Sequence, residues 1–244
     1  ALAALQATFV HTPLWALHPN AVLLWHHVSA GGTASRPIMG PVTWQLSRGQ
    51  CVGVIGQCGS GKSTLLRSAI GDVPVHGGHI QWGVGQSLDQ ACCYLPQVPI
   101  LCEGQTIFTH ITQGRVVAMH EVVEICQRLG CHRLIRQLPE GYASQVGAKG
   151  VVLSGGLRQL IALASIVLSP RPVLLLDEPT NHLDVATIEW LEQRLKAFRG
   201  SIVLISHDRT FLKNTTQTTL WLDEGIIRRL NKGYGHFEEW ADKL

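Results

Sequence analysis

The sequence lacks the features of several protein classes. It has no run of 18 or more apolar residues, which excludes an ordinary membrane-spanning helix. The formal net charge is only +3, which is too small to indicate a nucleic-acid-binding surface by itself. The seven cysteines are odd in number and include no C-x-x-C pair, so no disulfide framework is predicted. We expect reduced thiols and a cytoplasmic protein.

Apolar residues make up 45% of the 244 residues, enough for one large α/β domain. Short apolar runs predict strands, and longer periodic segments predict helices, which together favour a mainly parallel sheet covered on both faces. A Gly-rich loop is expected at 29–37. We assign residues 1–20 to a linker or arm, 21–240 to the domain, and 241–244 to the start of a C-terminal linker or tail. The expected strands are 22–28, 50–55, 91–95, 173–176 and 202–205, and the expected helices are 63–70, 120–138, 157–168 and 188–198.

A phosphate-binding loop follows the second predicted strand. Residues 56–64 read GQCGSGKST and fit G-x-x-x-x-G-K-[ST] between a strand and a helix. Backbone N–H groups in such a loop surround phosphate oxygens, and the helix N-terminus adds its positive end. Lys62 would bridge the β- and γ-phosphates, and the Ser63 hydroxyl would bind Mg²⁺. The expected nucleotide-binding residues are Gly56, Gly59, Ser60, Gly61, Lys62, Ser63 and Thr64.

Two acids end the strand predicted at 173–176. Ligands of α/β sheets sit at the carboxyl ends of the strands, so both acids are candidates for the same site. Asp177 would hold the Mg²⁺ shell, and Glu178 would act as general base on the attacking water. A solvated strand end is the alternative for such a pair taken alone.

A second candidate anion site opens the buried helix predicted at 157–168. It consists of Leu153, Ser154, Gly155 and Gly156, whose amides would lie at a helix N-terminus. One chain needs only one γ-phosphate cradle, so this second cradle would serve the nucleotide of another copy. A glycine turn that only caps the helix is the alternative.

Two further polar residues follow predicted strands. His207 comes after the strand at 202–205, where it could hydrogen-bond a γ-phosphate or the attacking water. Gln97 comes after the strand at 91–95. Taken alone, each is a weak signal, because such side chains are commonly structural or solvated.

In their order along the chain, from residues 56–64 through Gln97, residues 153–156 and residues 173–178 to His207, the motifs resemble the ABC (ATP-binding cassette) ATPase superfamily over residues 22–240. The resemblance implies a P-loop NTPase fold with an antiparallel N-terminal β subdomain and a helical subdomain that carries the 153–156 signature. It implies hydrolysis of ATP with Mg²⁺, driving a pair of cassettes to close and open. Gln97 would contact Mg²⁺ and couple to the partner, Asp184 would contact the opposite cassette, and Ser154 would act on the partner's nucleotide.

The subclass signals are mixed. The runs DEPTNHLD (177–184), SHDRTFL (206–212) and LNKGYGHFEEW (230–240) resemble the ABC-F class, soluble tandem-cassette proteins that act on ribosomes. The runs YLPQ (94–97) and LPEGY (138–142) instead resemble exporter cassettes. We therefore favour an ABC-F-like factor that is associated with the ribosome or RNA. A cassette docked on a separate membrane domain and a degenerate ATP-binding regulatory module are the alternatives.

Some positions depart from the superfamily. The aromatic residue that stacks on adenine is expected at 29–33, where none occurs, and Trp25 is the nearest substitute or a core residue. Leu160 and Ser165 stand where basic residues are common. These departures bear on base preference and on the signature helix, and they leave the catalytic set intact.

Overall fold

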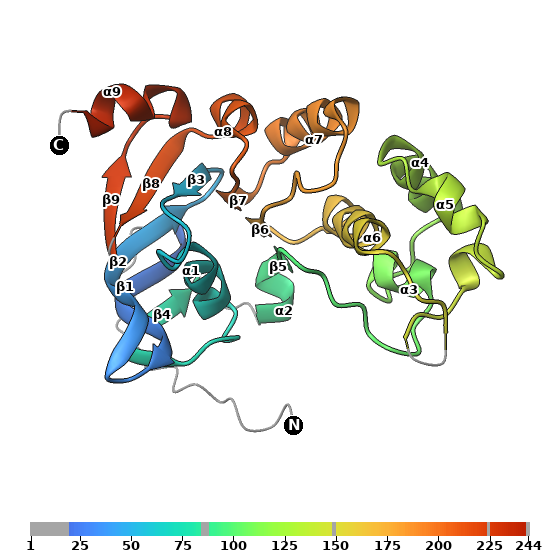
Figure 1. Cartoon of the computed structure of the whole chain (residues 1–244), viewed down its shortest axis with the longest axis horizontal. Helices are drawn as coiled ribbons and strands as arrows, with labels where there is room; N and C mark the ends of the chain where they lie inside the picture. Colours follow the sequence, from blue (N-terminus) through green and yellow to red (C-terminus); the bar gives the residue numbers. More distant parts are fainter. Residues whose placement is uncertain (1–19, 84–87, 148–149, 224, 243–244) are drawn as a thin grey trace. The chain divides into compact units, whose positions relative to one another are not determined.

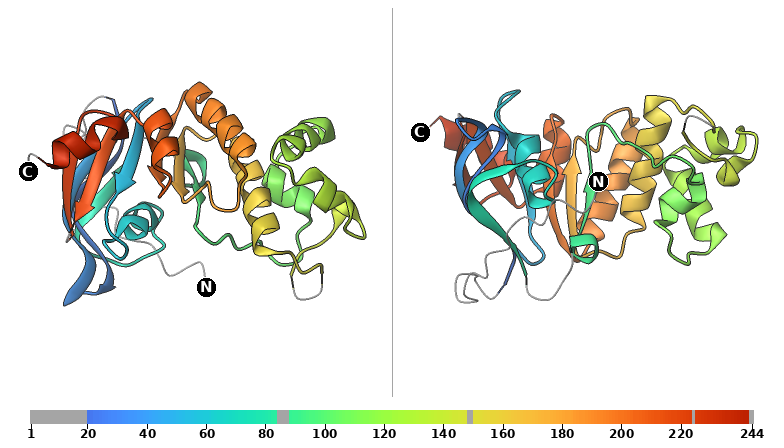
Figure 2. Two further views of the ribbon diagram at one scale, coloured as in Figure 1. Left: turned by 45° about the horizontal axis from the view of Figure 1, so that its top comes forward. Right: turned by 90° about the horizontal axis from the view of Figure 1, so that it is seen from below.

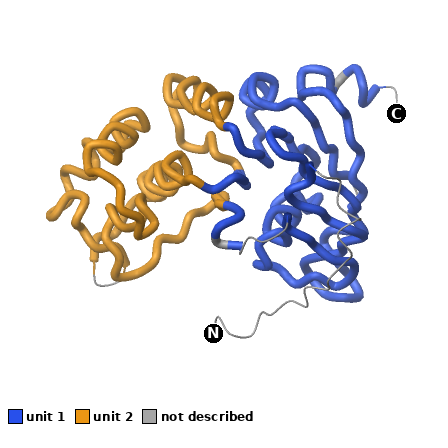
Figure 3. The backbone as a smooth tube through the Cα atoms, turned by 180° about the vertical axis from the view of Figure 1, so that it is seen from behind, with its two compact units in different colours: residues 1–92, 171–177, 199–244 blue, residues 93–170, 178–198 orange. Residues whose placement is uncertain are grey.

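The computed structural model describes residues 20–83, 88–147, 150–223 and 225–242 (Figure 1). The chain forms two compact units (Figure 3). The first consists of Ala1–Cys92, Arg171–Asp177 and Arg199–Leu244, and the second of Cys93–Pro170 and Glu178–Phe198. The arm expected at 1–20 lies almost entirely outside the described residues. Within the described ranges no helix has the length and apolar character needed to cross a bilayer.

An antiparallel sheet begins the first unit, as expected for the N-terminal β subdomain. Its strand order is β2-β1-β4, from β1 (Ala21–Thr33), β2 (Arg36–Ser47) and β4 (Val75–Trp82). The loop predicted at 29–37 is wrong, because β1 continues to Thr33 and β2 begins at Arg36. Gly31 and Gly32 have φ angles of 71° and 65° beside a register shift, so an irregular strand carries the glycines that suggested a loop.

A six-stranded sheet has the order β5-β6-β7-β3-β8-β9. Strands β6, β7, β3 and β8 pair in parallel, and β9 is antiparallel to β8, which agrees with the predicted P-loop NTPase fold. All residues of β6 and β7 are buried. Strand β9 also lies beside β2 of the antiparallel sheet (Figure 2). The strands are β5 (Cys92–Leu95), β6 (Val173–Asp177), β7 (Ser201–Ile205), β3 (Cys51–Ile55), β8 (Thr218–Asp223) and β9 (Ile226–Leu230).

Short helices complete the first unit. Helix α1 is the next element after β3 in the chain, and α8 is the next after β7. The helical segments are α1 (Lys62–Ala69), α2 (Leu88–Ala91), α8 (Arg209–Thr215), the 3₁₀ turn η3 (Tyr234–His236) and α9 (Phe237–Ala241). The strands β2, β4, β8 and β9 and the helices α8 and α9 were not predicted from the sequence.

The second unit is mainly helical, as expected for the signature subdomain. Helix α6 packs on α3 and α4, and its buried side chains include Leu157, Ile161 and Ile166. The single helix predicted at 120–138 is wrong: the chain forms α4 and α5, separated at Gly130, whose φ is 75°. The elements are α3 (Ile107–Thr112), α4 (Met119–Arg128), α5 (His132–Arg136), η2 (Gly141–Ala143), α6 (Gly155–Val167) and α7 (Val185–Ala197).

All seven cysteines are free thiols, as expected from their number and spacing. Five of them are buried, and Cys58 and Cys102 are exposed.

Candidate functional site

The phosphate-binding loop connects β3 to α1, as the sequence predicts. Gly61 adopts the left-handed conformation (φ 99°) and is the N-cap of α1. At Gly56 a Cβ atom would lie 2.1 Å from the Leu222 carbonyl oxygen, so only glycine fits beside β8. The Ser60 hydroxyl is buried and has no hydrogen-bond partner among the described residues. Since an unpaired buried hydroxyl is costly, this orphaned group fits a loop that closes around a polar ligand.

Backbone carbonyl groups of this loop hold the Lys62 side chain in place. Its ammonium donates to the carbonyl oxygens of Gly56 (2.8 Å) and Gln57 (2.7 Å). An ammonium has three N–H donors, so these two bonds leave capacity for a phosphate oxygen. Its neighbour Ser63 is the second residue of α1, and Thr64 is the third.

Asp177 lies at the end of β6 and is 2% exposed. Burial raises the pKa of this carboxyl, while a hydrogen bond with Ser63 and the nearby charge of Lys62 act in the opposite direction. Ser63 and Asp177 thus bring a hydroxyl and a carboxyl oxygen together. Oxygen pairs of this kind suit Mg²⁺, and a cation beside them would offset the burial of the charge.

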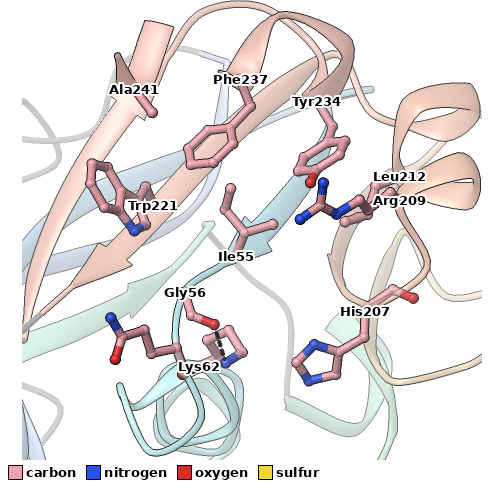
Figure 4. Close-up of a pocket in the computed structure, with 12 residues that line it drawn as sticks. Ile55, Gly56, Lys62, His207, Arg209, Leu212, Trp221, Tyr234, Phe237 and Ala241 are labelled. Carbon is pink, nitrogen blue, oxygen red and sulfur yellow. Dashed lines mark hydrogen bonds between the residues drawn. The ribbon is translucent and has the colours of Figure 1, made fainter. Parts of the chain in front are cut away.

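His207 lies two residues after β7 and lines a pocket of about 380 Å³. Gly56, Gln57 and Lys62 also line this pocket, so His207 faces the same space as the start of the phosphate-binding loop. Figure 4 shows Lys62 and His207 on one side of Ile55 and three aromatic rings on the other.

The aromatic wall of this pocket was not predicted from the sequence. It consists of Trp221 from β8, Tyr234 from η3 and Phe237 from α9. The Tyr234 and Phe237 rings are stacked with centroids 5.7 Å apart, and Phe237 meets Trp221 edge-on, also at 5.7 Å. The Arg228 guanidinium lies 5.1 Å from the Trp221 ring centre. The run at 230–240 was the available signal, but its packing depends on contacts that are distant in sequence.

Trp25 is a core residue and does not provide the missing adenine-stacking surface. It is 0% exposed and stacks on Trp44 with centroids 5.0 Å apart. Its indole N–H donates to the Ser68 hydroxyl of α1 at 3.1 Å. One face of the ring and its polar edge therefore have partners inside the first unit, and the buried side chain has no exposed surface to offer a ligand.

Glu178 and Gln97 belong to the second unit. Glu178 is 4% exposed and has a left-handed backbone (φ 54°), with its carbonyl accepting from the Asn181 N–H. A non-glycine residue in this conformation costs about 1–2 kcal/mol. Such strain is concentrated at functional positions. Gln97 is exposed after β5.

The signature residues lie at the N-terminus of α6. Ser154 is the N-cap, and its hydroxyl accepts from the Leu157 N–H at 3.2 Å. Leu153 is buried, whereas Ser154 and Gly155 are exposed and Gly156 is half-buried. The tetrapeptide therefore caps the helix, as the alternative supposed, and it also leaves the helix N-terminus accessible.

Asp184 is the N-cap of α7, where its carboxylate accepts from the Thr187 N–H at 2.8 Å. A hydrogen bond with the Thr187 side chain, and then this bond to the Thr187 backbone, lower the pKa of Asp184. The first unit thus brings together the phosphate-binding loop, Asp177 and His207. The second unit carries Gln97, the signature residues, Glu178 and Asp184.

Comparison with known proteins gives one family. A family model described as ABC transporter matches residues 39–181. The ABC transporter ATP-binding protein YfmR of Bacillus subtilis is 31% identical over 228 residues, covering 81% of this chain and 36% of the relative. The energy-dependent translational throttle protein EttA of Mycobacterium tuberculosis is 30% identical, covering 85% of this chain and 42% of the relative.

Transporters match as well. The mitochondrial iron-sulfur clusters transporter ABCB7 of Rattus norvegicus is 30% identical, covering 88% of this chain and 29% of the relative. A solved bacterial Atm1-family ABC exporter with ATP bound has a TM-score of 0.74 at 27% identity, covering 93% of this chain and 42% of that chain. The chain spans less than half the length of each of these relatives.

Proposed function

The chain belongs to the ABC transporter family and is an ATP hydrolase, and from this premise we propose that it is the cassette of an ABC-F-like factor that acts on ribosomes. The residues 177–184, 206–212 and 230–240 support this subclass. The strongest support is that the last of these runs supplies two of the three aromatic residues, Tyr234 and Phe237, in the wall of the pocket beside Lys62 and His207. A class-specific segment thus lies where it can respond to the nucleotide.

For ATP binding, we assign the phosphates to Gly56, Gly59, Ser60, Gly61, Lys62, Ser63 and Thr64. Ser63, Asp177 and Gln97 would hold the Mg²⁺, and the hydrogen bond between Ser63 and Asp177 supports the first two. The ion supplies charge neutralisation between the phosphate oxygens.

The Lys62 ammonium contributes the charge-assisted hydrogen bonds of this site. Bonds to charged groups contribute about 1.5–3 kcal/mol each. Lys62→Ala should therefore weaken ATP binding roughly 10- to 100-fold in a nucleotide titration. Lys232→Ala, which removes an exposed lysine from the same unit, is the matched control. Equal affinities for the two variants would contradict the assignment of the phosphate site.

For hydrolysis, we assign the general base to Glu178 and a supporting hydrogen bond to His207. Glu178→Gln keeps the size of the side chain but cannot accept the proton from water. Because general bases contribute about 10²–10⁴-fold, turnover should fall by that factor while ATP binding persists. Wild-type turnover in this variant would exclude Glu178 as the base. A degenerate binding module, the third alternative, predicts no Lys62-dependent turnover at all.

We also propose that two cassettes pair, either as two copies of this chain or as tandem domains of one protein. The exposed N-terminus at Ser154 and Gly155 would then face the nucleotide of the partner, and Asp184 would contact the partner. The Glu178→Gln protein should dimerise with MgATP in light scattering or sedimentation, and Ser154→Arg should prevent this. If the Glu178→Gln protein stays monomeric at saturating MgATP, pairing of two copies is excluded, and the partner is a different cassette.

The subclass requires an experiment in the natural host with the complete protein. We expect the Glu178→Gln protein to sediment with ribosomes in ATP, and the Lys62→Ala control to remain in the supernatant. The alternative is a cassette docked on a membrane domain, which the exporter-like runs and the match to the Atm1-family exporter favour. Recovery with membranes, independent of ribosomes, would support that alternative. We propose a cytoplasmic location and one cassette over 21–240, with 1–20 as an arm and 241–244 as the start of a linker.

A further inference from the structure

The antiparallel sheet of the first unit carries a cluster of histidines that the ATPase function does not use. His26 of β1 and His79 of β4 are direct cross-strand partners. Their ring centroids lie 4.8 Å apart, with an angle of 32° between the planes. His27 meets His26 edge-on at 4.6 Å. Three imidazoles therefore lie side by side on adjacent strands.

The backbone is shaped to bring these rings together. Consecutive side chains of a regular strand point to opposite faces, so His26 and His27 should not touch. Here the pairing of β1 with β4 shifts register between His26 and Ser29, and His27 has a positive φ of 51°. Gly78 makes this bulge possible on the facing strand. A Cβ atom at Gly78 would lie 2.2 Å from the His27 carbonyl oxygen and 2.3 Å from that of His26.

The rings also have the chemistry of ligands. The Nε2 atom of His79 is buried without a hydrogen-bond partner in the described part of the chain. Burial first, and then the nearby His26, lower the pKa of His79. Its imidazole is therefore neutral at neutral pH, which is the form that binds metal ions. Imidazole nitrogens suit Zn²⁺, Ni²⁺ and Cu²⁺, whereas Mg²⁺ prefers oxygen.

We propose that His26 and His79 form a binding site for one divalent transition-metal ion, separate from the nucleotide site. No three His, Cys, Asp or Glu side chains converge on one point among the described residues, so water would complete the coordination. Metal–nitrogen bonds of about 2.0–2.1 Å place two bound nitrogens about 3.3 Å apart in a tetrahedral site. The ring centroids of His26 and His79 are 4.8 Å apart, so rotation of the side chains can bring one nitrogen of each ring to this spacing. The bound ion would cross-link β1 to β4.

The test is titration of the whole 244-residue chain, without a polyhistidine tag, with NiCl₂ in a calorimeter and with CuCl₂ by electron paramagnetic resonance. We expect one ion per chain, a nitrogen-ligated Cu²⁺ spectrum and a higher melting temperature with metal. His26→Ala with His79→Ala should weaken binding at least roughly tenfold. The matched control, His120→Ala with His236→Ala, removes two exposed histidines from other elements and should bind as the wild type does.

The single variant His26→Ala guards against loss of folding, because this side chain is exposed. It should also weaken binding by at least roughly tenfold while its circular dichroism and its basal ATP turnover match the wild type. Stoichiometric binding retained by the folded double or single variant would overturn the proposal. Equal weakening in the His120→Ala/His236→Ala control would overturn it as well, since the binding would then be scattered over surface histidines.

Discussion

Alanine at Gly56 should damage the first unit far more than alanine at Gly59. Both glycines lie in the phosphate-binding loop, and both have positive φ, 152° and 81°. A Cβ atom at Gly59 would meet nothing within 4 Å. One at Gly56 would lie 2.1 Å from the Leu222 carbonyl oxygen and 2.8 Å from the Ser60 hydroxyl oxygen. Alanine at Gly59 therefore measures backbone strain alone, whereas alanine at Gly56 adds a steric clash to that strain.

The magnitudes follow from these contacts. At Gly59 only the left-handed backbone opposes alanine, at a cost of about 1–2 kcal/mol. At Gly56 the φ of 152° lies in a region that is almost restricted to glycine, which costs about 1–3 kcal/mol. The contact with Leu222 must also open by about 0.9 Å to reach 3.0 Å, and overpacking of this kind adds about 1–3 kcal/mol. We expect losses of about 2–6 kcal/mol at Gly56, against a domain stability of about 5–15 kcal/mol.

Urea denaturation followed by tryptophan fluorescence measures these losses. The described tryptophans of the first unit outnumber the single one of the second unit, Trp190, so the signal reports mainly on the sheet that carries the loop. We expect a clearly lower midpoint for Gly56→Ala than for Gly59→Ala, and weaker ATP binding because β3 and β8 must separate. If both variants lose the same free energy of unfolding, the close packing of Gly56 on Leu222 is wrong.

Three further predictions concern buried and capping residues. Trp25→Ala should lower the free energy of unfolding by about 3–5 kcal/mol in urea denaturation and leave the ATP affinity of the folded protein unchanged. A loss of ATP affinity without a loss of stability would show instead that Trp25 stacks on adenine. Because burial raises the pKa of Asp177 above its ordinary 3.8, the charged form opposes folding, and this penalty grows as pH rises through the raised pKa. Asp177→Asn should therefore be more stable than the wild type near pH 7, and this difference should vanish below pH 3.8. The variant should also lose its stabilisation by MgATP. A variant less stable than the wild type near pH 7 would contradict this reasoning. Ser154→Ala should cost about 1 kcal/mol by removing the N-cap of α6, and Ser154→Asn should restore thermal stability without restoring turnover.

Local chemistry made the centre of the site predictable. The loop from Gly56 to Lys62 requires glycine conformations and a following helix, and both can be recognised in a few residues. Asp177 was predicted in the same way, because the short apolar run before it indicates a buried strand and places Asp177 at its carboxyl end. The helix at 157–168 was predicted from its apolar run, and Ser154 from its place at the N-terminus of that helix.

The remainder depends on contacts that are distant in sequence. Strands β4 and β9 are half-buried or exposed along much of their length and show no regular alternation, so no period marked them. The break between α4 and α5 rests on Gly130, which interrupts an otherwise continuous apolar spacing. Trp221 and Phe237 form a pocket wall only after β8 pairs and α9 folds back. No local pattern places these two rings together.

The position of β3 in the sheet has a consequence for synthesis of the protein. Among the described strands its neighbours are β7 and β8, and its first residue, Cys51, pairs with Ile202. At about 5–20 residues per second, a ribosome needs roughly 8–30 s to make the intervening chain. Four of the five residues of β3, Cys51 to Val54, are buried in the folded protein. During this interval they have no β7 strand to pair with. The loop that would hold the nucleotide is thus made well before β7 and β8, the two strands that secure it, and over this interval β3 is exposed to binding by chaperones.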